Sequence, residues 1–97
     1  MNRNYARGAR AEYLAIGRLH EAGYPTTFRS AGSHGVFDVF GFNRRMGLAV
    51  QVKTGALSKS QLAAAVAQIE DAVMPKGMKR ALWHHLGRGA WVEYVVG

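Results

Sequence analysis

Two short apolar segments joined by an arginine-containing turn stand at the centre of the hydrophobic pattern. They run from Val36 to Phe42 and from Gly47 to Lys53, a pattern typical of a β-hairpin. Polar groups interrupt both segments, Asp38 in the first and Gln51 and Lys53 in the second. Because burying an unpaired charge is costly, a strand accepts such groups when they are paired, bind a metal or take part in chemistry.

The register of this hairpin decides whether the polar groups can meet. Side chains alternate between the two faces of a strand, so Gln51 and Lys53 share one face. A four-residue turn at 43–46 would place Phe42 opposite Gly47 and Asp38 opposite Gln51, whereas a slip of one residue would turn every side chain to the other face. We predict the four-residue turn, or a bulge with the same effect.

A helix is predicted before the hairpin, over Tyr5 to Ala22, ending at Gly23. At about 100° per residue, one arc of this helix is apolar and Glu12 falls inside it, so we expect the helix to pack on a sheet with Glu12 directed inward. Another side gathers arginines. The apolar arc contains Tyr5, Ala9, Tyr13, Ile16 and Leu19, and the arginines are Arg3, Arg7, Arg10 and Arg18.

The remaining pattern predicts one strand before the hairpin and a helix and two strands after it. Ser58 and Gln61 have the spacing of a capping box, and the alanine-rich stretch that follows should be helical until Val73 or Met74. The expected architecture is one α/β domain over residues 1–97, with a central mixed five-stranded sheet flanked by two main helices in the order α-β-β-β-α-β-β. The three strands are expected at Tyr24 to Ser30, Lys79 to Leu86 and Ala90 to Val96.

Charge narrows the range of partners. Thirteen Lys and Arg against six Asp and Glu give a net charge of +7, which favours a polyanion, with nucleic acid as the first candidate. Cysteine is absent, so any metal must be held by oxygen or imidazole ligands. Because no apolar run has the length of a signal peptide or membrane span, we expect no membrane partner and a cytoplasmic location, in a prokaryotic cell or a virus-infected host.

Three side chains from separate elements offer oxygen ligands for one ion. Glu12, Asp38 and Gln51 would form a site for a hard cation such as Mg²⁺, which prefers oxygen ligands and retains several waters. Lys53, on the same face as Gln51, could activate a water or stabilise charge developing on a phosphate.

These candidate site residues belong to a set of short motifs that resembles a known protein family. Together they resemble the archaeal-type Holliday junction resolvases of the PD-(D/E)XK nuclease superfamily, over roughly the first 55 residues, and the later helix and hairpin agree with the restriction-endonuclease-like order of elements. The motifs are Arg7-Gly8-x-x-x-Glu12, Gly23-Tyr24, Arg29-Ser30-Ala31-Gly32-Ser33, Asp38 and Gln51-x-Lys53.

The resemblance implies a Mg²⁺-dependent endonuclease, with Mn²⁺ able to substitute, that cuts four-way DNA junctions as a homodimer by paired symmetric nicks. By position, Glu12, Asp38 and Gln51 would hold the metal, Lys53 would serve the attacking water, and Ser33 would lie near the scissile phosphate. Arg7 and Arg29 would contact DNA. The other basic residues of the first helix and the hairpin turn could grip phosphates of separate duplex arms, namely Arg10, Arg44 and Arg45.

Two departures from the family pattern leave other functions open. Gln51 stands where the family usually has glutamate, which removes one negative charge from the metal site, and the spacing from Ser33 to Asp38 is one residue longer. A lapsed site would leave a non-catalytic, basic junction-binding module. A repair-type nuclease of the same superfamily, acting on duplex or flapped DNA, is the other alternative.

Several residues also have simpler structural interpretations. Glu12 could pair with Arg7 or Arg10 on its own helix. Lys53 could protect a sheet edge, and Ser33 and His34 could be ordinary loop residues. Exposed tryptophan on the last two strands is a candidate dimer surface.

Overall fold

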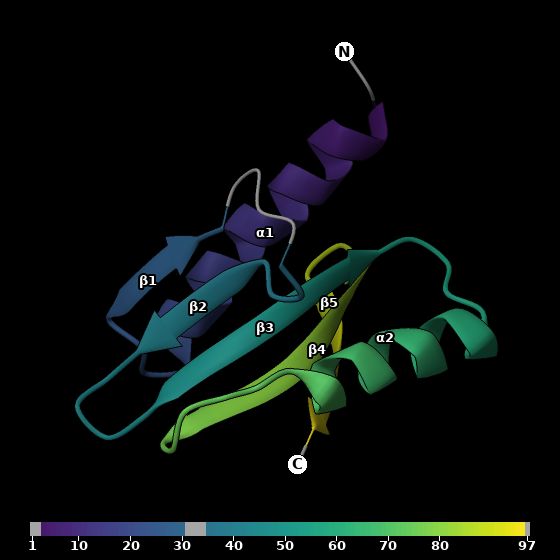
Figure 1. Ribbon diagram of the computed structural model, residues 1–97. Coiled ribbons are helices and arrows are strands. Elements are labelled where there is room, and N and C mark those ends of the chain that lie inside the picture. The colour runs from purple at the N-terminus through teal and green to yellow at the C-terminus, as the bar shows by residue number, and fades with distance from the viewer. Residues whose placement is uncertain (1–2, 31–34, 97) are drawn as a thin grey trace.

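A five-stranded mixed sheet with one helix on each face makes up the protein, seen here in a computed structural model that describes residues 3–30 and 35–96, and side chains from residue 8 onward (Figure 1). The predicted fold class and order of elements are confirmed. The elements are α1 (Arg3–Glu21), β1 (Thr26–Arg29), β2 (Val39–Phe42), β3 (Gly47–Thr54), α2 (Lys59–Asp71), β4 (Met78–Gly87) and β5 (Ala90–Val96).

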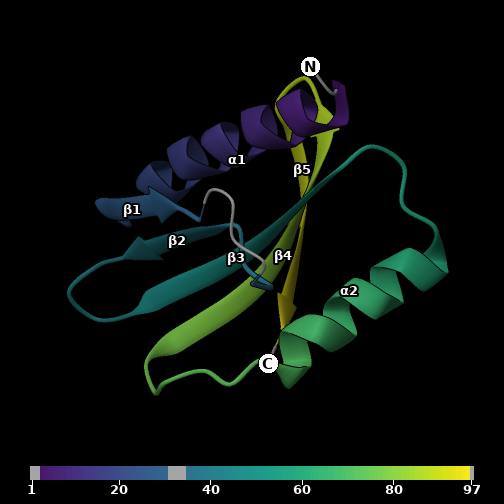
Figure 2. The same ribbon diagram turned by 45° about the horizontal axis from the view of Figure 1, so that its top comes forward.

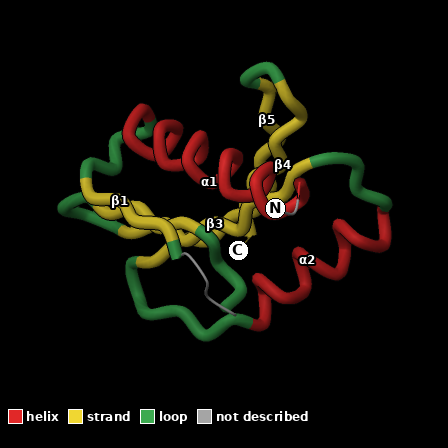
Figure 3. The backbone as a smooth tube through the Cα atoms, turned by 90° about the horizontal axis from the view of Figure 1, so that it is seen from above, coloured by secondary structure: helices red, strands yellow, loops and turns green. Residues whose placement is uncertain are grey.

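The strands lie in the sheet in the order in which they occur along the chain, β1 to β5. Neighbours are antiparallel except β3 and β4, which are parallel and joined through α2, as a parallel pair requires a crossover. Viewed from above, α1 and α2 lie on opposite sides of the strands (Figure 3). A 45° turn of the first view shows α1 over β1 and β2, and α2 beside β4 and β5 (Figure 2).

Each helix closes its own apolar core against the sheet. Under α1 the sheet contributes Val39, Val50 and Trp83, whereas the α2 side is built on Ala49 and Leu82. The central strands are therefore covered on both faces, which explains their nearly continuous apolar sequences.

The buried side of α1 is rotated from the predicted arc. Tyr13, predicted on the apolar face, is 62% exposed, and the fully buried line is Ala11, Ala15 and Leu19. The small alanines let α1 approach the sheet closely. A Cβ added at Gly41 of β2 would lie 2.9 Å from the Leu19 side chain. Glu12 lies largely buried at the margin of this buried line.

The hairpin has the predicted register, with Phe42 opposite Gly47 and a four-residue turn between them. The turn is held by Asn43, whose Oδ1 accepts hydrogen bonds from the backbone N–H of Arg45 (2.8 Å) and of Met46 (2.9 Å). The first strand is shorter than predicted and begins at Val39 rather than Val36.

The capping box at the start of α2 is confirmed, since Ser58 and Gln61 exchange both hydrogen bonds. The helix ends at Asp71, before the predicted Val73 or Met74. The Arg80 guanidinium of β4 caps this end, because its Nη1 lies 2.8–3.1 Å from the carbonyl oxygens of residues 69, 70 and 72.

Candidate active site

Asp38 lies immediately before β2 and is tied to the strands on both sides. Its N–H donates to the carbonyl of Val50 at 2.8 Å, and its carbonyl accepts from Ser30 N–H at 2.8 Å. Its carboxylate Oδ2 accepts from the N–H of Val52, also at 2.8 Å. Continuing the hairpin register by one residue places Asp38 opposite Gln51, as the four-residue turn predicted.

Glu12 of α1 forms an ion pair with Arg29, the last residue of β1, at 3.1 Å. Both side chains are about four-fifths buried, with relative exposures of 21% for Glu12 and 19% for Arg29. The guanidinium also lies over the ring of Tyr13, 4.6 Å from its centroid. The partner of Glu12 therefore comes from another element, and not from Arg10 of its own helix. An arginine predicted to contact DNA holds a predicted metal ligand in place.

The groups around Asp38 shift the pKa of its carboxyl. Burial raises the pKa of this carboxyl above its ordinary value, and the hydrogen bond from Val52 N–H opposes that rise. The Glu12 carboxylate raises the pKa further, and the Lys53 ammonium lowers it. The charges of Glu12 on α1 and Lys53 on β3 therefore both act on Asp38.

Gln51 is the buried polar residue of this cluster. It lies on β3 with 7% of its surface exposed, and its side-chain Oε1 has no hydrogen-bond partner among the residues that the structure describes. A buried carbonyl oxygen without a partner loses its hydration and gains nothing in return. This oxygen is therefore available to accept a hydrogen bond or to bind a cation.

Lys53 follows on the same face of β3 and is half-buried. Since β3 lies between β2 and β4, the interpretation of Lys53 as a residue that protects a sheet edge is wrong. Its side chain borders a hollow against α2 that is also lined by Gln61 and Gln68.

The donor set fits a hard divalent cation through oxygen. No three His, Asp or Glu side chains within residues 8–30 and 35–96 could hold a metal by themselves. Two carboxylates, from Glu12 and Asp38, and the unpartnered amide oxygen of Gln51 form the available set. Oxygen ligands of this kind suit Mg²⁺, which keeps part of its water shell.

The other predicted site residues fall into three groups. Ser33 lies outside the described residues, as do the side chain of Arg7 and the loop histidine His34, which was not predicted to belong to the site. Arg10 is exposed on α1, and Arg44 and Arg45 are exposed in the β2–β3 turn, where phosphates could reach them.

Arg18 and the tryptophans differ from the sequence-based expectation. Arg18, which the helical wheel groups with the other arginines of the first helix, packs over the rings of Trp83 and Trp91, 4.5 and 5.6 Å from their centroids. Trp83 is 1% exposed and donates its Nε1–H to Glu93. The expectation of an exposed dimer surface is wrong for Trp83, because this side chain is needed in the core under α1.

Comparison with solved structures gives an informative match. No family model matches the sequence, and no curated protein matches it. Among solved structures, the chain is similar to Hjc of Archaeoglobus fulgidus, a Holliday junction resolvase from an archaeal hyperthermophile, with a TM-score of 0.67 and 27% identity, covering 93% of this chain and 73% of that one. The resemblance seen in the motifs is thus confirmed across the fold, and the chain is a structural relative of the archaeal-type Holliday junction resolvases.

Proposed function

We propose that this protein is a structure-selective, metal-dependent endonuclease that resolves four-way DNA junctions by paired symmetric nicks. The observation that carries the proposal is the surroundings of Asp38, which is bound to β3, sensitive to both Glu12 and Lys53, and opposite Gln51, whose carbonyl oxygen is unpartnered in the described part of the chain. The similarity to a Holliday junction resolvase supports the nuclease class, and the net charge of +7 supports a nucleic-acid substrate.

Each residue of the cluster has a chemical role in this proposal. Glu12, Asp38 and Gln51 would hold Mg²⁺, or Mn²⁺ in its place, and the bound ion would polarise the phosphate and acidify a water. Lys53 orients the attacking water and stabilises charge that develops on the phosphate. Arg29 keeps the Glu12 carboxylate in position. A contact between Ser33 and the scissile phosphate remains a prediction.

A homodimer follows from the symmetry of the substrate. A four-way junction has two-fold symmetry, and each chain offers one candidate site, so paired symmetric cuts need two copies related by a two-fold axis. Exposed arginines at two separate places, Arg10 on α1 and Arg44 and Arg45 in the β2–β3 turn, would hold phosphates of different arms. Recognition would then depend on the shape of the junction rather than on its sequence.

One assay separates this function from its alternatives. End-labelled four-way junction, flap and plain duplex are incubated with Mg²⁺ or Mn²⁺, with Asp38→Asn as the inactive control. Symmetric nicks confined to the junction support the resolvase, and cutting of all three substrates supports a general repair-type nuclease.

Gln51 is the observation that favours a second candidate, a junction-binding module with a lapsed catalytic site. An amide in place of a carboxylate leaves the metal site with one negative charge less, so the ion should bind more weakly. Tight junction binding without a nick at any concentration of Mg²⁺ or Mn²⁺ would establish this alternative and overturn the nuclease.

A further inference from the structure

A second polar hollow lies on the α1 face of β3, opposite to the face that carries the Lys53 side chain. It has a volume of about 520 Å³ and lies between α1, the segment after β3 and the β4–β5 hairpin. Thr54 lines it and directly follows Lys53, and Ala11 lines it and directly precedes Glu12. Alternation along β3 turns Thr54 towards α1 and Lys53 towards α2, so the hollow and the catalytic cluster share a wall without sharing side chains.

The lining of this hollow is cationic and rich in hydrogen-bond donors. Arg10 and Arg88 bring guanidinium groups from two elements, and Thr54 brings a hydroxyl. His85 also lines the hollow, and its Nε2 is buried with no hydrogen-bond partner in the described part of the chain. The described lining contains no carboxylate to neutralise the arginines. Paired guanidinium groups are suited to phosphate oxygens because their N–H groups are fixed in a planar fork.

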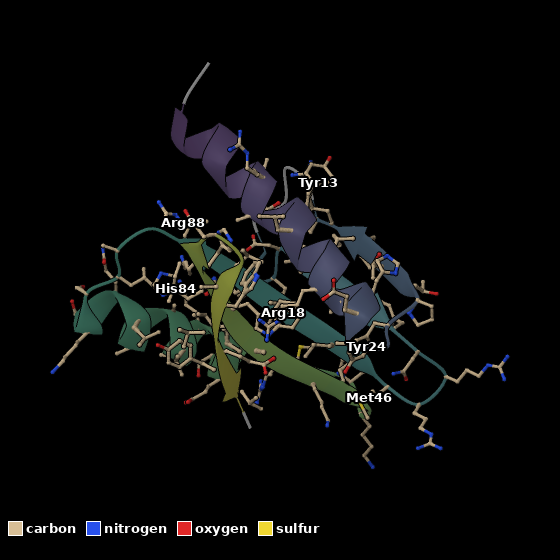
Figure 4. The ribbon with its side chains drawn as sticks, turned by 180° about the vertical axis from the view of Figure 1, so that it is seen from behind. Tyr13, Arg18, Tyr24, Met46, His84 and Arg88 are labelled. Carbon is tan, nitrogen blue, oxygen red and sulfur yellow. The ribbon has the colours of Figure 1, made fainter. Side chains whose placement is uncertain are left out.

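The backbone at the hairpin tip places Arg88 in a conformation that favours glycine. Arg88 has φ of +52°, between Gly87 at +97° and Gly89 at +76°. Glycine adopts this left-handed region without steric penalty, whereas arginine does so at a cost, so glycine would be the more stable residue at position 88. Figure 4 shows Arg88 at this tip, on the side of the molecule where α1 begins.

We propose that this hollow binds a backbone phosphate of the DNA, beside the phosphate that is cut. Arg10 and Arg88 grip the phosphate oxygens, the Thr54 hydroxyl is a further donor, and His85 Nε2 donates in the tautomer that carries its proton there. The inference rests on the proposed DNA substrate and adds a site on the β4–β5 hairpin that the family motifs do not reach. Binding here would fix the direction in which a DNA arm leaves the catalytic cluster.

The test uses Arg88→Gly, because this change removes the guanidinium and also relieves the backbone strain. Affinity for a labelled four-way junction is measured at several salt concentrations in the absence of Mg²⁺. We expect about a fivefold loss of affinity at low salt and a decrease of about one in the slope of log K against log[salt], as for one lost phosphate contact. We also expect a melting temperature equal to or above that of the wild type, which excludes misfolding as the cause.

Lys76→Gly is the matched control, since it removes one exposed positive charge in the loop before β4, at the other end of that strand. An equal loss in both variants would reduce the effect to net charge and overturn the site, as would unchanged binding by Arg88→Gly. Wild-type protein that binds no junction would instead overturn the proposed function itself.

Discussion

Helix α1 meets two polar clusters, and they are built in opposite ways. Near its C-terminal half, Arg18 lies over Trp83 and Trp91 and 4.0 Å from Glu93, which in turn accepts the Trp83 Nε1–H. We call these four residues the tryptophan cluster. Every charge in it faces an opposite charge, a ring or a donor.

Around Glu12 the pairing is incomplete, although Glu12 itself is paired with Arg29. The Glu12 carboxylate raises the pKa of Asp38, and the buried Oε1 of Gln51 has no partner in the described residues. Satisfied polar networks stabilise a fold, whereas like charges and orphaned acceptors destabilise it and persist where a ligand completes them. The contrast indicates that the tryptophan cluster holds α1 to the sheet, whereas the residues around Glu12 and Asp38 have the incomplete pairing that the proposed metal site requires.

The largest expected effect is a loss of cleavage rate when Lys53 is replaced. Lys53→Ala should lower the cleavage rate at saturating Mg²⁺ at least about 100-fold, because it removes the ammonium that, in the proposed mechanism, stabilises the charge developing on the phosphate. Junction affinity should change less than about threefold. Single-turnover nicking is the measurement. Lys59→Ala, an exposed lysine at the start of α2, is the control, and equal rates for the two variants would contradict the role of Lys53.

Arg18→Ala should instead lower the stability of the fold. We expect a loss of about 2 kcal/mol in the free energy of unfolding, since the change removes cation–π contacts to two rings and leaves Glu93 without its cation. For a domain of this size the melting temperature should fall by about 10 °C. Arg10→Ala, an exposed arginine of the same helix, should cost less than about 0.5 kcal/mol. Equal losses in these two variants would remove the distinction between the clusters.

Two substitutions of Gln51 should have opposite effects on the metal-free melting temperature. Gln51→Glu restores a carboxylate, so it should lower the Mg²⁺ concentration for half-maximal cleavage about tenfold while lowering the metal-free melting temperature through repulsion with Asp38. Gln51→Met removes the orphaned oxygen at similar volume, so it should raise the metal-free melting temperature and abolish the shift caused by Mg²⁺. Thermal unfolding with and without Mg²⁺ measures both. An unchanged metal response in both variants would exclude Gln51 as a ligand.

The smallest expected effect is a pH-dependent gain of stability in Asp38→Asn. Because burial raises the pKa of Asp38 in the folded state, the folded protein favours the protonated form, and stability from this group is present in acid and lost as the pH rises. Asparagine cannot ionise and still accepts from Val52 N–H, so the variant should melt a few degrees higher at pH 7.

This gain should disappear below about pH 4, where the wild-type carboxyl is also protonated in the unfolded chain. Asp71→Asn, at the exposed end of α2, provides the comparison and should show no such trend. A gain that is the same at every pH would contradict the buried charge as its cause.

The local rules of the chain determined much of the architecture. Alternation and the Asn43 turn set the hairpin register that places Asp38 opposite Gln51, and the Ser58 capping box began α2 where predicted. These features depend on residues a few positions apart, whose geometry follows from backbone periodicity alone. The motifs and their spacing were therefore sufficient to name the candidate metal ligands.

Only the tertiary structure decided which polar groups are paired and which are open. Glu12 meets Arg29 from 17 positions away, Arg18 meets Trp83 on a distant strand, and Arg88 comes beside α1 through a hairpin tip. No periodicity encodes such contacts, because they depend on how deeply the small alanines of α1 let it settle on the sheet. The same packing turned Tyr13 outward and left the oxygen of Gln51 buried without a partner among the described residues.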